Sequence, residues 1–173
     1  GDGQSAELCL QGTPLAPSQA LTIGRTLLRG NQDQQQRGEA MLLQLAKDHP
    51  DSQEALKSAA LLSEPLRPKQ ALINALPESL QQRSADVAAA RVRLAGGEGG
   101  LVVLQRWPGH PASWQLQWDL AREALLRGQW EQARSWLTAI TPEQLPDPLR
   151  ARQQFWLGMC MDKLGDRKGG QEI

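Results

Sequence analysis

The stretch that decides the fold is Leu120-Ala-Arg-Glu-Ala-Leu-Leu-Arg-Gly128-Gln-Trp130-Glu-Gln-Ala133. Apolar side chains recur at helical spacing through 112–127, and a second amphipathic segment follows over 130–140. The glycine between the two segments tolerates a turn conformation that other residues avoid. Small side chains at Ala121 and Ala133 allow two paired helices to approach closely. The stretch therefore predicts a helical hairpin over 112–140.

The same spacing recurs near the C-terminus, where Leu157-Gly158 precedes Leu164-Gly165 in a helix that Pro148 opens as its first residue. A weaker copy begins at Ile23-Gly24, with a turn near Asn31 and an extended connection before Ala40. This frame is that of the tetratricopeptide repeat, and the turn glycines lie 37 residues apart, close to the family period of about 34. The clearest repeat positions are Leu120, Ala121, Gly128, Trp130, Ala133, Leu157, Gly158, Leu164 and Gly165.

Helix-forming residues dominate the whole chain while β-branched residues are sparse, so the predicted fold class is all-α. We expect a stack of antiparallel helical hairpins, a tetratricopeptide-like α-superhelix. Residues 1–16 are an irregular N-terminal segment and 17–173 form the helical-repeat domain, with the best-defined hairpins at 112–140 and 148–173, the last one truncated. The alternative is an irregular helical bundle.

Four finer expectations follow from this helical pattern. The polar tract 31–36 is expected to separate the first two helices, and Ala40 is expected to lie on the apolar face of the second. Leu101-Val-Val-Leu104 is expected to be a short helix, because an isolated strand would have nothing to pair with. The run 155–161 is apolar around most of a helix, which predicts burial on several sides.

Composition excludes several functional classes. Lysine plus arginine and aspartate plus glutamate both number 19, so no net charge attracts nucleic acid. No run of about 18 apolar residues and no signal-peptide pattern occurs, which predicts no membrane span and places any export signal outside this sequence. Cys9 and Cys160 lie far apart, outside any zinc-ligand spacing, and do not identify the redox compartment.

Few residues suggest chemistry, so no catalytic residue, metal ligand or cofactor is predicted. Glu78-Ser79 would need a desolvating cleft to act as an acid and base, but it follows a proline and is typical of a helix start, as is Glu143. His49 and His110 sit beside prolines as solvated loop residues. Cys160 is interpreted as a small core residue.

The aromatic residues all fall between Trp107 and Trp156. Helical spacing places four tryptophans in the core, whereas Trp107, beside Pro108 in a turn, is the exposed one and the candidate ligand-binding residue. The arginines of this region form a solvated face with local ion pairs. The expected core tryptophans are Trp114, Trp118, Trp130 and Trp136, and the arginines are Arg122, Arg127, Arg134, Arg150 and Arg152.

Two segments carry a family resemblance. Trp130-Glu-Gln-Ala-Arg-Ser-Trp136-Leu and Arg150-Ala-Arg-Gln-Gln-Phe-Trp-Leu-Gly-Met-Cys-Met-Asp-Lys-Leu-Gly165-Asp resemble the α-superhelical region of soluble lytic murein transglycosylases, and 34–52 looks like an earlier hairpin of it. Cyanobacterial members come closest. The resemblance implies an enzyme of the cell envelope or periplasm that cleaves peptidoglycan glycan strands with one glutamate as acid and base.

The resemblance also has departures. The catalytic-domain motifs Gly-Leu-Met-Gln and Ala-Tyr-Asn-Ala-Gly do not occur in this sequence, so the catalytic domain is expected beyond Ile173. The first hypothesis is a non-catalytic arm that guides glycan strands to that domain. The second is a tetratricopeptide-type adaptor that binds a protein segment, with no enzymatic role. No residue constellation supports a self-contained enzyme.

Overall fold

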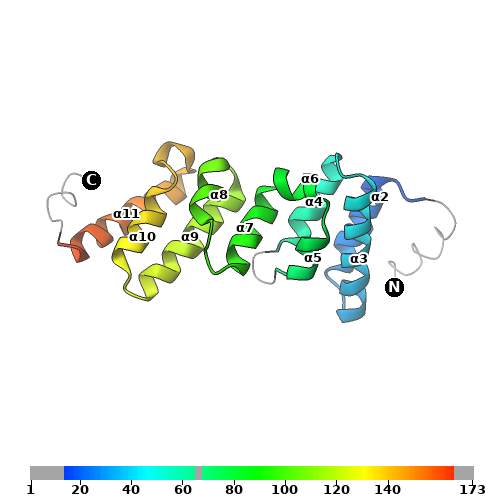
Figure 1. Cartoon of the computed structure of the whole chain (residues 1–173), viewed down its shortest axis with the longest axis horizontal. Helices are drawn as coiled ribbons and strands as arrows, with labels where there is room; N and C mark the ends of the chain where they lie inside the picture. The colour runs from blue at the N-terminus through cyan, green and yellow to red at the C-terminus, as the bar shows by residue number, and fades with distance from the viewer. Residues whose placement is uncertain (1–13, 65–67, 166–173) are drawn as a thin grey trace. The chain divides into compact units, whose positions relative to one another are not determined.

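The computed structural model describes residues 14–64 and 68–165. Within these residues every regular element is a helix and no strand occurs, which confirms the all-α prediction (Figure 1). Leu101–Leu104 lies inside a helix, as expected. Cys9, most of the predicted N-terminal segment and the residues after Gly165 lie outside the described residues.

The chain divides into two compact units, residues 1–94 and 95–173. The predicted domain over 17–173 spans both, and its continuity stays a prediction. Unit 1 contains α2 (Pro17–Leu27), α3 (Gln32–Asp48), α4 (Gln53–Leu62), α5 (Gln70–Ala75), α6 (Glu78–Arg83) and α7 (Ala85–Leu94). Unit 2 contains α8 (Gly100–Arg106), α9 (Pro111–Leu126), α10 (Trp130–Thr138), the 3-10 helix η1 (Pro142–Gln144) and α11 (Asp147–Lys163).

The start of α3 corrects the predicted polar separator. Asn31 Oδ1 accepts a hydrogen bond from the Gln34 backbone N–H at 2.9 Å, and Gln34 Oε1 accepts one from the Asn31 backbone N–H at 2.9 Å. This reciprocal capping box satisfies two donors that a helix start otherwise leaves unpaired. The polar tract is therefore the first turn of α3, and only Leu28–Asn31 separates α2 from α3.

Two glycines bring α2 and α3 close together. A Cβ atom on Gly38 would lie 2.9 Å from the Gly24 carbonyl oxygen and 2.9 Å from Leu27 Cβ. The predicted small residue Gly24 therefore has Gly38 as its partner. Ala40 was expected on the apolar face but is exposed. It lies two residues after Gly38, which faces α2, and residues two apart in a helix lie on different faces.

The core of unit 1 continues from α2 and α3 into α4–α7. Leu42, Ala55, Ile73 and Val87 are fully buried members of one apolar cluster. Ser52 caps α4, because its Oγ accepts a hydrogen bond from the Ala55 backbone N–H at 3.0 Å.

In unit 2, α9 and α10 form the hairpin that the sequence predicts at 112–140. Ala121 and Ala133 are 0% exposed and belong to one apolar cluster. Gly128 has φ of +69°, and the next N–H, that of Gln129, donates to the Ala124 carbonyl at 2.9 Å. Gly165 repeats this left-handed conformation with φ of +78° after α11. Both turn glycines thus meet a conformational need that other residues would meet only with strain.

Two buried glutamines, Gln117 of α9 and Gln153 of α11, hold the C-terminal end of α10. Gln117 Nε2 donates to the Trp136 and Leu137 carbonyls at 3.0 and 3.3 Å. Gln153 Nε2 donates to the Leu137 and Ile140 carbonyls at 2.5 and 2.7 Å. Carbonyls at and just after the end of a helix have few backbone donors within reach, so this glutamine pair supplies donors to them from both neighbouring helices. α10 is therefore fixed between α9 and α11.

The exposure of α11 contradicts the prediction of burial on several sides. Only Gln153 and Cys160 are buried in this helix, whereas Phe155 is 62% and Met159 36% exposed. A Cβ atom on Gly158 would meet no other atom within 4 Å. α11 packs on α10 and contacts Trp118 of α9, whereas Phe155 and Met159 are left exposed by the described residues. The apolar periodicity alone does not distinguish a covered face from an uncovered one.

Candidate functional site

An open groove of about 240 Å³ lies at the α9–α10 turn of unit 2. Its walls come from the last two turns of α9, the first two turns of α10 and the glycine-rich loop before α8. We call it the turn groove. Its lining residues are Gly96, Gly97, Leu120, Glu123, Ala124, Arg127, Gln129, Gln132 and Trp136.

Charged and amide side chains form the rim of the turn groove. Glu123 Oε1 and Arg127 Nη2 are 2.7 Å apart, with Glu123 in the last turn of α9 and Arg127 at its C-cap, and both side chains are more than half exposed. Such an exposed ion pair contributes at most about 1 kcal/mol to stability, so either side chain can give up this contact and bind a ligand instead. With the amides of Gln129 and Gln132 beside them, the rim offers both hydrogen-bond donors and acceptors and no net charge.

Trp136 supplies the aromatic surface of the turn groove. Its ring is half-buried and packs against the apolar cluster that contains Ala121 and Ala133. Its Cζ3 and Cη2 atoms lie 3.0 Å from the point where a Cβ of Gly100 would stand, so a side chain at Gly100 would displace the indole. The groove therefore depends on glycine at the start of α8.

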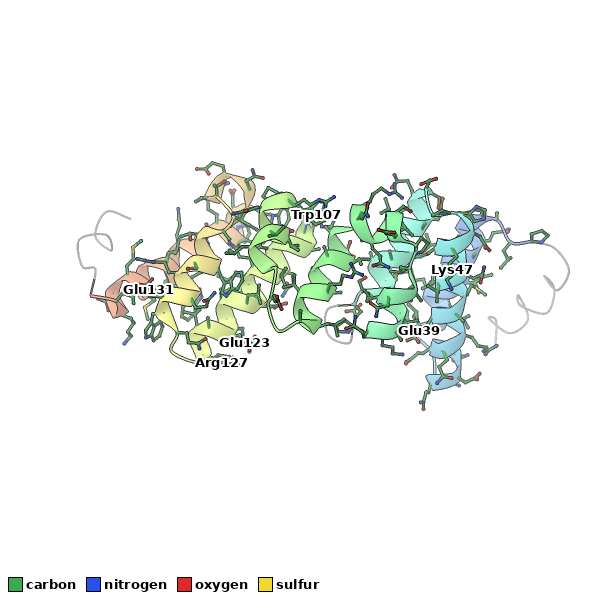
Figure 2. The ribbon with its side chains drawn as sticks, viewed as in Figure 1. Glu39, Lys47, Trp107, Glu123, Arg127 and Glu131 are labelled. Atoms are coloured by element: carbon green, nitrogen blue, oxygen red, sulfur yellow. The ribbon has the colours of Figure 1, made fainter. Side chains whose placement is uncertain are left out.

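Trp107, the predicted binding residue, lies elsewhere. It caps the C-terminal end of α8 and is half-buried, with the Arg106 guanidinium 4.4 Å from its ring centroid. Figure 2 shows it at the opposite end of unit 2 from Glu123 and Arg127. The structure therefore does not bring Trp107 into the turn groove, and its ligand-binding role stays a prediction.

The four tryptophans expected in the core are all half-buried. The Trp118 ring lies 6.2 Å from that of Trp156, and the Arg152 guanidinium stacks 4.0 Å from its centroid. Burial lowers the pKa of Arg152, and the charge of Asp119 opposes this shift. Trp114 Nε1 donates to the Pro108 carbonyl at 2.8 Å. These rings are thus partly structural and partly accessible.

Residues from both predicted hairpins meet in one apolar cluster of unit 2. Ala121 and Ala133 are buried there with Cys160, and Trp130 and Leu157 pack against them half-buried. Leu120 is also buried, whereas Gly128 and Gly165 lie exposed at the turns. Gly158 and Leu164 are half-buried on α11. Four of these positions therefore pack in the cluster, whereas the close helix approach expected at Gly158 is not seen, because a Cβ atom there would meet no other atom within 4 Å.

The remaining candidates have local structural roles. Glu78 begins α6 and accepts a hydrogen bond from Gln82, and Glu143 is exposed in η1. His49 is exposed at the end of α3, but His110 is no simple loop residue, because its Nδ1 caps α9 by accepting the Ala112 N–H at 3.1 Å. Burial raises the pKa of the Cys160 thiol, with Arg134 opposing the shift, which does not favour a nucleophile.

Local ion pairs occupy most of the arginines singled out by sequence. Arg134 pairs with Glu131 at 2.9 Å and Arg150 with Asp147 at 3.4 Å. Arg150 also donates to the Pro142 and Leu145 carbonyls, which ties η1 to α11. Within residues 14–64 and 68–165, no group of three or more potential metal ligands occurs.

Sequence reasoning did not identify the turn groove or the glutamine pair. The signal for the pair is a glutamine on an otherwise apolar stripe, since Gln117 lies three residues from both Trp114 and Leu120.

Of the helices in the described part of the chain, none has the length and apolarity to cross a bilayer. No protein-family model, no curated protein and no solved structure shows a significant match to this chain.

Proposed function

We propose that this chain is a non-catalytic helical scaffold of tetratricopeptide type, from the α-superhelical region of a peptidoglycan lytic transglycosylase. In this proposal the turn groove helps to guide glycan strands in the cell envelope to a catalytic domain outside this chain. The observation that carries it is the combination in the turn groove of the Trp136 indole with a neutral rim of donors and acceptors.

The chemistry of the turn groove suits a glycan. An N-acetylated sugar presents C–H faces that pack on an aromatic ring, together with hydroxyl and acetamide groups that both donate and accept hydrogen bonds. Arg127 supplies donors, Glu123 supplies acceptors, and the amides of Gln129 and Gln132 supply both. Because the groove is open, it suits a segment of a polymer that continues beyond it at either end.

Two close helix approaches support a repeat of tetratricopeptide type. The α9–α10 pair buries Ala121 and Ala133 and turns at Gly128, as the repeat frame expects. The α2–α3 pair uses Gly24 and Gly38 in the same way.

Co-sedimentation with purified, protein-free peptidoglycan tests the proposal. The double variant Arg127→Gln/Gln132→Ala keeps the core intact and is expected to bind about fivefold more weakly than wild type, through loss of two polar contacts. Arg122→Gln, on the exposed face of the same helix, is the matched control and should bind like wild type. Absence of binding by the wild-type chain refutes the glycan role.

Trp107→Ala provides a separate arm of this experiment. Reduced sedimentation would support the predicted binding role of Trp107, at the end of unit 2 away from the turn groove. Unchanged sedimentation would show that this tryptophan does not contact glycan.

A second candidate is an adaptor that binds a protein segment, and the exposed Phe155 and Met159 on α11 favour it. Large apolar side chains at contiguous surface positions are typical of protein contacts. A Phe155→Gln variant separates the two candidates, because it should leave peptidoglycan binding unchanged if the turn groove is the glycan site.

A further inference from the structure

A cavity of about 290 Å³ opens in unit 1, where the C-terminal ends of α2 and α4 meet α3 and the start of α5. Its volume is near the lower end of the ~300–1,000 Å³ range of small-molecule sites. It has no part in the turn groove, so its role is independent of the function proposed above.

Leucine side chains form the inner walls of this cavity. Leu28, Leu61 and Leu72 are half-buried and pack on the apolar cluster of unit 1 with their remaining surface lining the cavity. Apolar surface that faces water in a concave site favours a ligand with an aliphatic part, because binding removes that surface from water.

Carboxylates dominate the charge at the mouth of the cavity. Glu39 accepts a hydrogen bond from the Lys69 ammonium, and its side chain is only 19% exposed. Glu64 is a second carboxylate at the mouth and is exposed. Two carboxylates and one ammonium leave one negative charge, which a single cation on a ligand would balance.

The helix ends add to this preference. Leu28 caps the C-terminal end of α2, and Leu61 lies in the last turn of α4, so the negative ends of two helices border the cavity. The N-terminal end of α5, which carries partial positive charge, opposes this preference, but α5 has only six residues. Both the side chains and the helix ends therefore favour a cation.

We propose that this cavity binds a primary alkylammonium group, with its methylene chain along Leu28, Leu61 and Leu72 and its ammonium at Glu64 and Glu39. A free aliphatic amine and the side chain of a lysine-type residue share this chemistry. A stem of about four or five methylenes, like that of lysine, can lie along an apolar surface while its ammonium stays in contact with water and charged groups.

Titration of the full chain with n-pentylamine, followed by NMR chemical shifts, tests this proposal at pH 7. Saturable shifts confined to the cavity residues are expected, whereas pentanoate and 1-pentanol, which match the chain length without the positive charge, should bind at least about fivefold more weakly. Nα-acetyl-lysine methylamide and its Nε-acetylated form distinguish the sources: saturation by the first alone assigns the site to lysine-type side chains, and saturation by pentylamine alone assigns it to free amines.

Two variants make the test decisive. Glu64→Gln should weaken pentylammonium binding about fivefold, the effect of removing one partly exposed charge pair, while Glu78→Gln, an exposed glutamate of α6 outside the cavity, should not. Leu72→Phe should fill the cavity and abolish binding while circular dichroism stays that of the wild type. Equal binding of pentanoate, unchanged binding by Glu64→Gln, or no saturable shift at about 20 mM amine would overturn the proposal.

Discussion

Replacing Gln153 by methionine tests how strongly the glutamine pair stabilises unit 2. Methionine keeps the length of the side chain but removes the amide that donates to the Leu137 and Ile140 carbonyls. Each lost hydrogen bond costs about 1 kcal/mol, and a buried carbonyl left without a partner costs a further ~1–2 kcal/mol. Leu137 keeps its bond from Gln117, so only the Ile140 carbonyl bears the second cost. Gln153 Oε1 has no partner among the described residues, so its removal loses no bond.

The free energy of unfolding should therefore fall by about 2–4 kcal/mol. All six tryptophans lie in unit 2, so urea unfolding followed by tryptophan fluorescence reports on this unit without contribution from unit 1. Gln154→Met, the same change at the exposed neighbouring position, is the control and should stay within about 0.5 kcal/mol of wild type.

A double-mutant cycle with Gln117→Met sharpens the test. Both amides donate to the Leu137 carbonyl, so the double variant leaves that carbonyl unpaired, and its loss should exceed the sum of the single losses by about 0.5–1 kcal/mol. If Gln153→Met unfolds within about 0.5 kcal/mol of wild type, the amide bonds do not hold α10 and the reasoning is wrong.

Three further predictions concern single positions. Gly38→Ala should cost about 1–3 kcal/mol by circular dichroism, because its Cβ would lie 2.9 Å from the Gly24 carbonyl oxygen, whereas Gly158→Ala, also inside a helix but in open space, should be neutral or stabilise by up to about 1 kcal/mol. Asn31→Ala should destabilise by about 1 kcal/mol in thermal unfolding through loss of the α3 cap, and Asn31→Ser should restore most of it. Burial raises the pKa of the Cys160 thiol, so the folded state favours the protonated thiol. The resulting contribution to folding stability is complete below the unfolded thiol pKa of about 8.5 and is lost as pH rises through the higher folded pKa. Unfolding free energies from pH 7 to 10 should therefore fall more steeply for wild type than for Cys160→Ala, and equal slopes would contradict the burial argument.

Local sequence signals predict much of the helical pattern. Ser52 and the prolines of the chain set helix starts through their own backbone chemistry, and Gly128 sets a turn through its φ angle. Such signals act over a few residues, so one sequence suffices to interpret them. Asn31 shows the limit, because a polar tract can be a loop or a capped first turn, and only the spacing of Asn31 and Gln34 distinguishes the two.

The candidate site could not be predicted in the same way. The turn groove needs the Gly96-Gly97 loop to lie beside Trp136, which depends on how α8 packs on α9 and not on any local pattern. Likewise, the apolar run of α11 identifies a helix that can pack on several sides, but the number of neighbours that cover it is a tertiary property. Trp107 was expected to be exposed because it lies in a turn, but its ring is half-buried and partly covered by the adjacent Arg106.

The glutamine pair also bears on the rate of folding. Its four amide–carbonyl bonds join residues that are only 13 to 20 positions apart in the chain. Closing a loop of that length loses little chain entropy, and domains rich in such short-range contacts reach the native state fastest. Unit 2 is therefore expected to fold rapidly from helices that are neighbours in sequence. The bonds from the two amides to the carbonyls at the end of α10 form only when α9, α10 and α11 pack in their native arrangement.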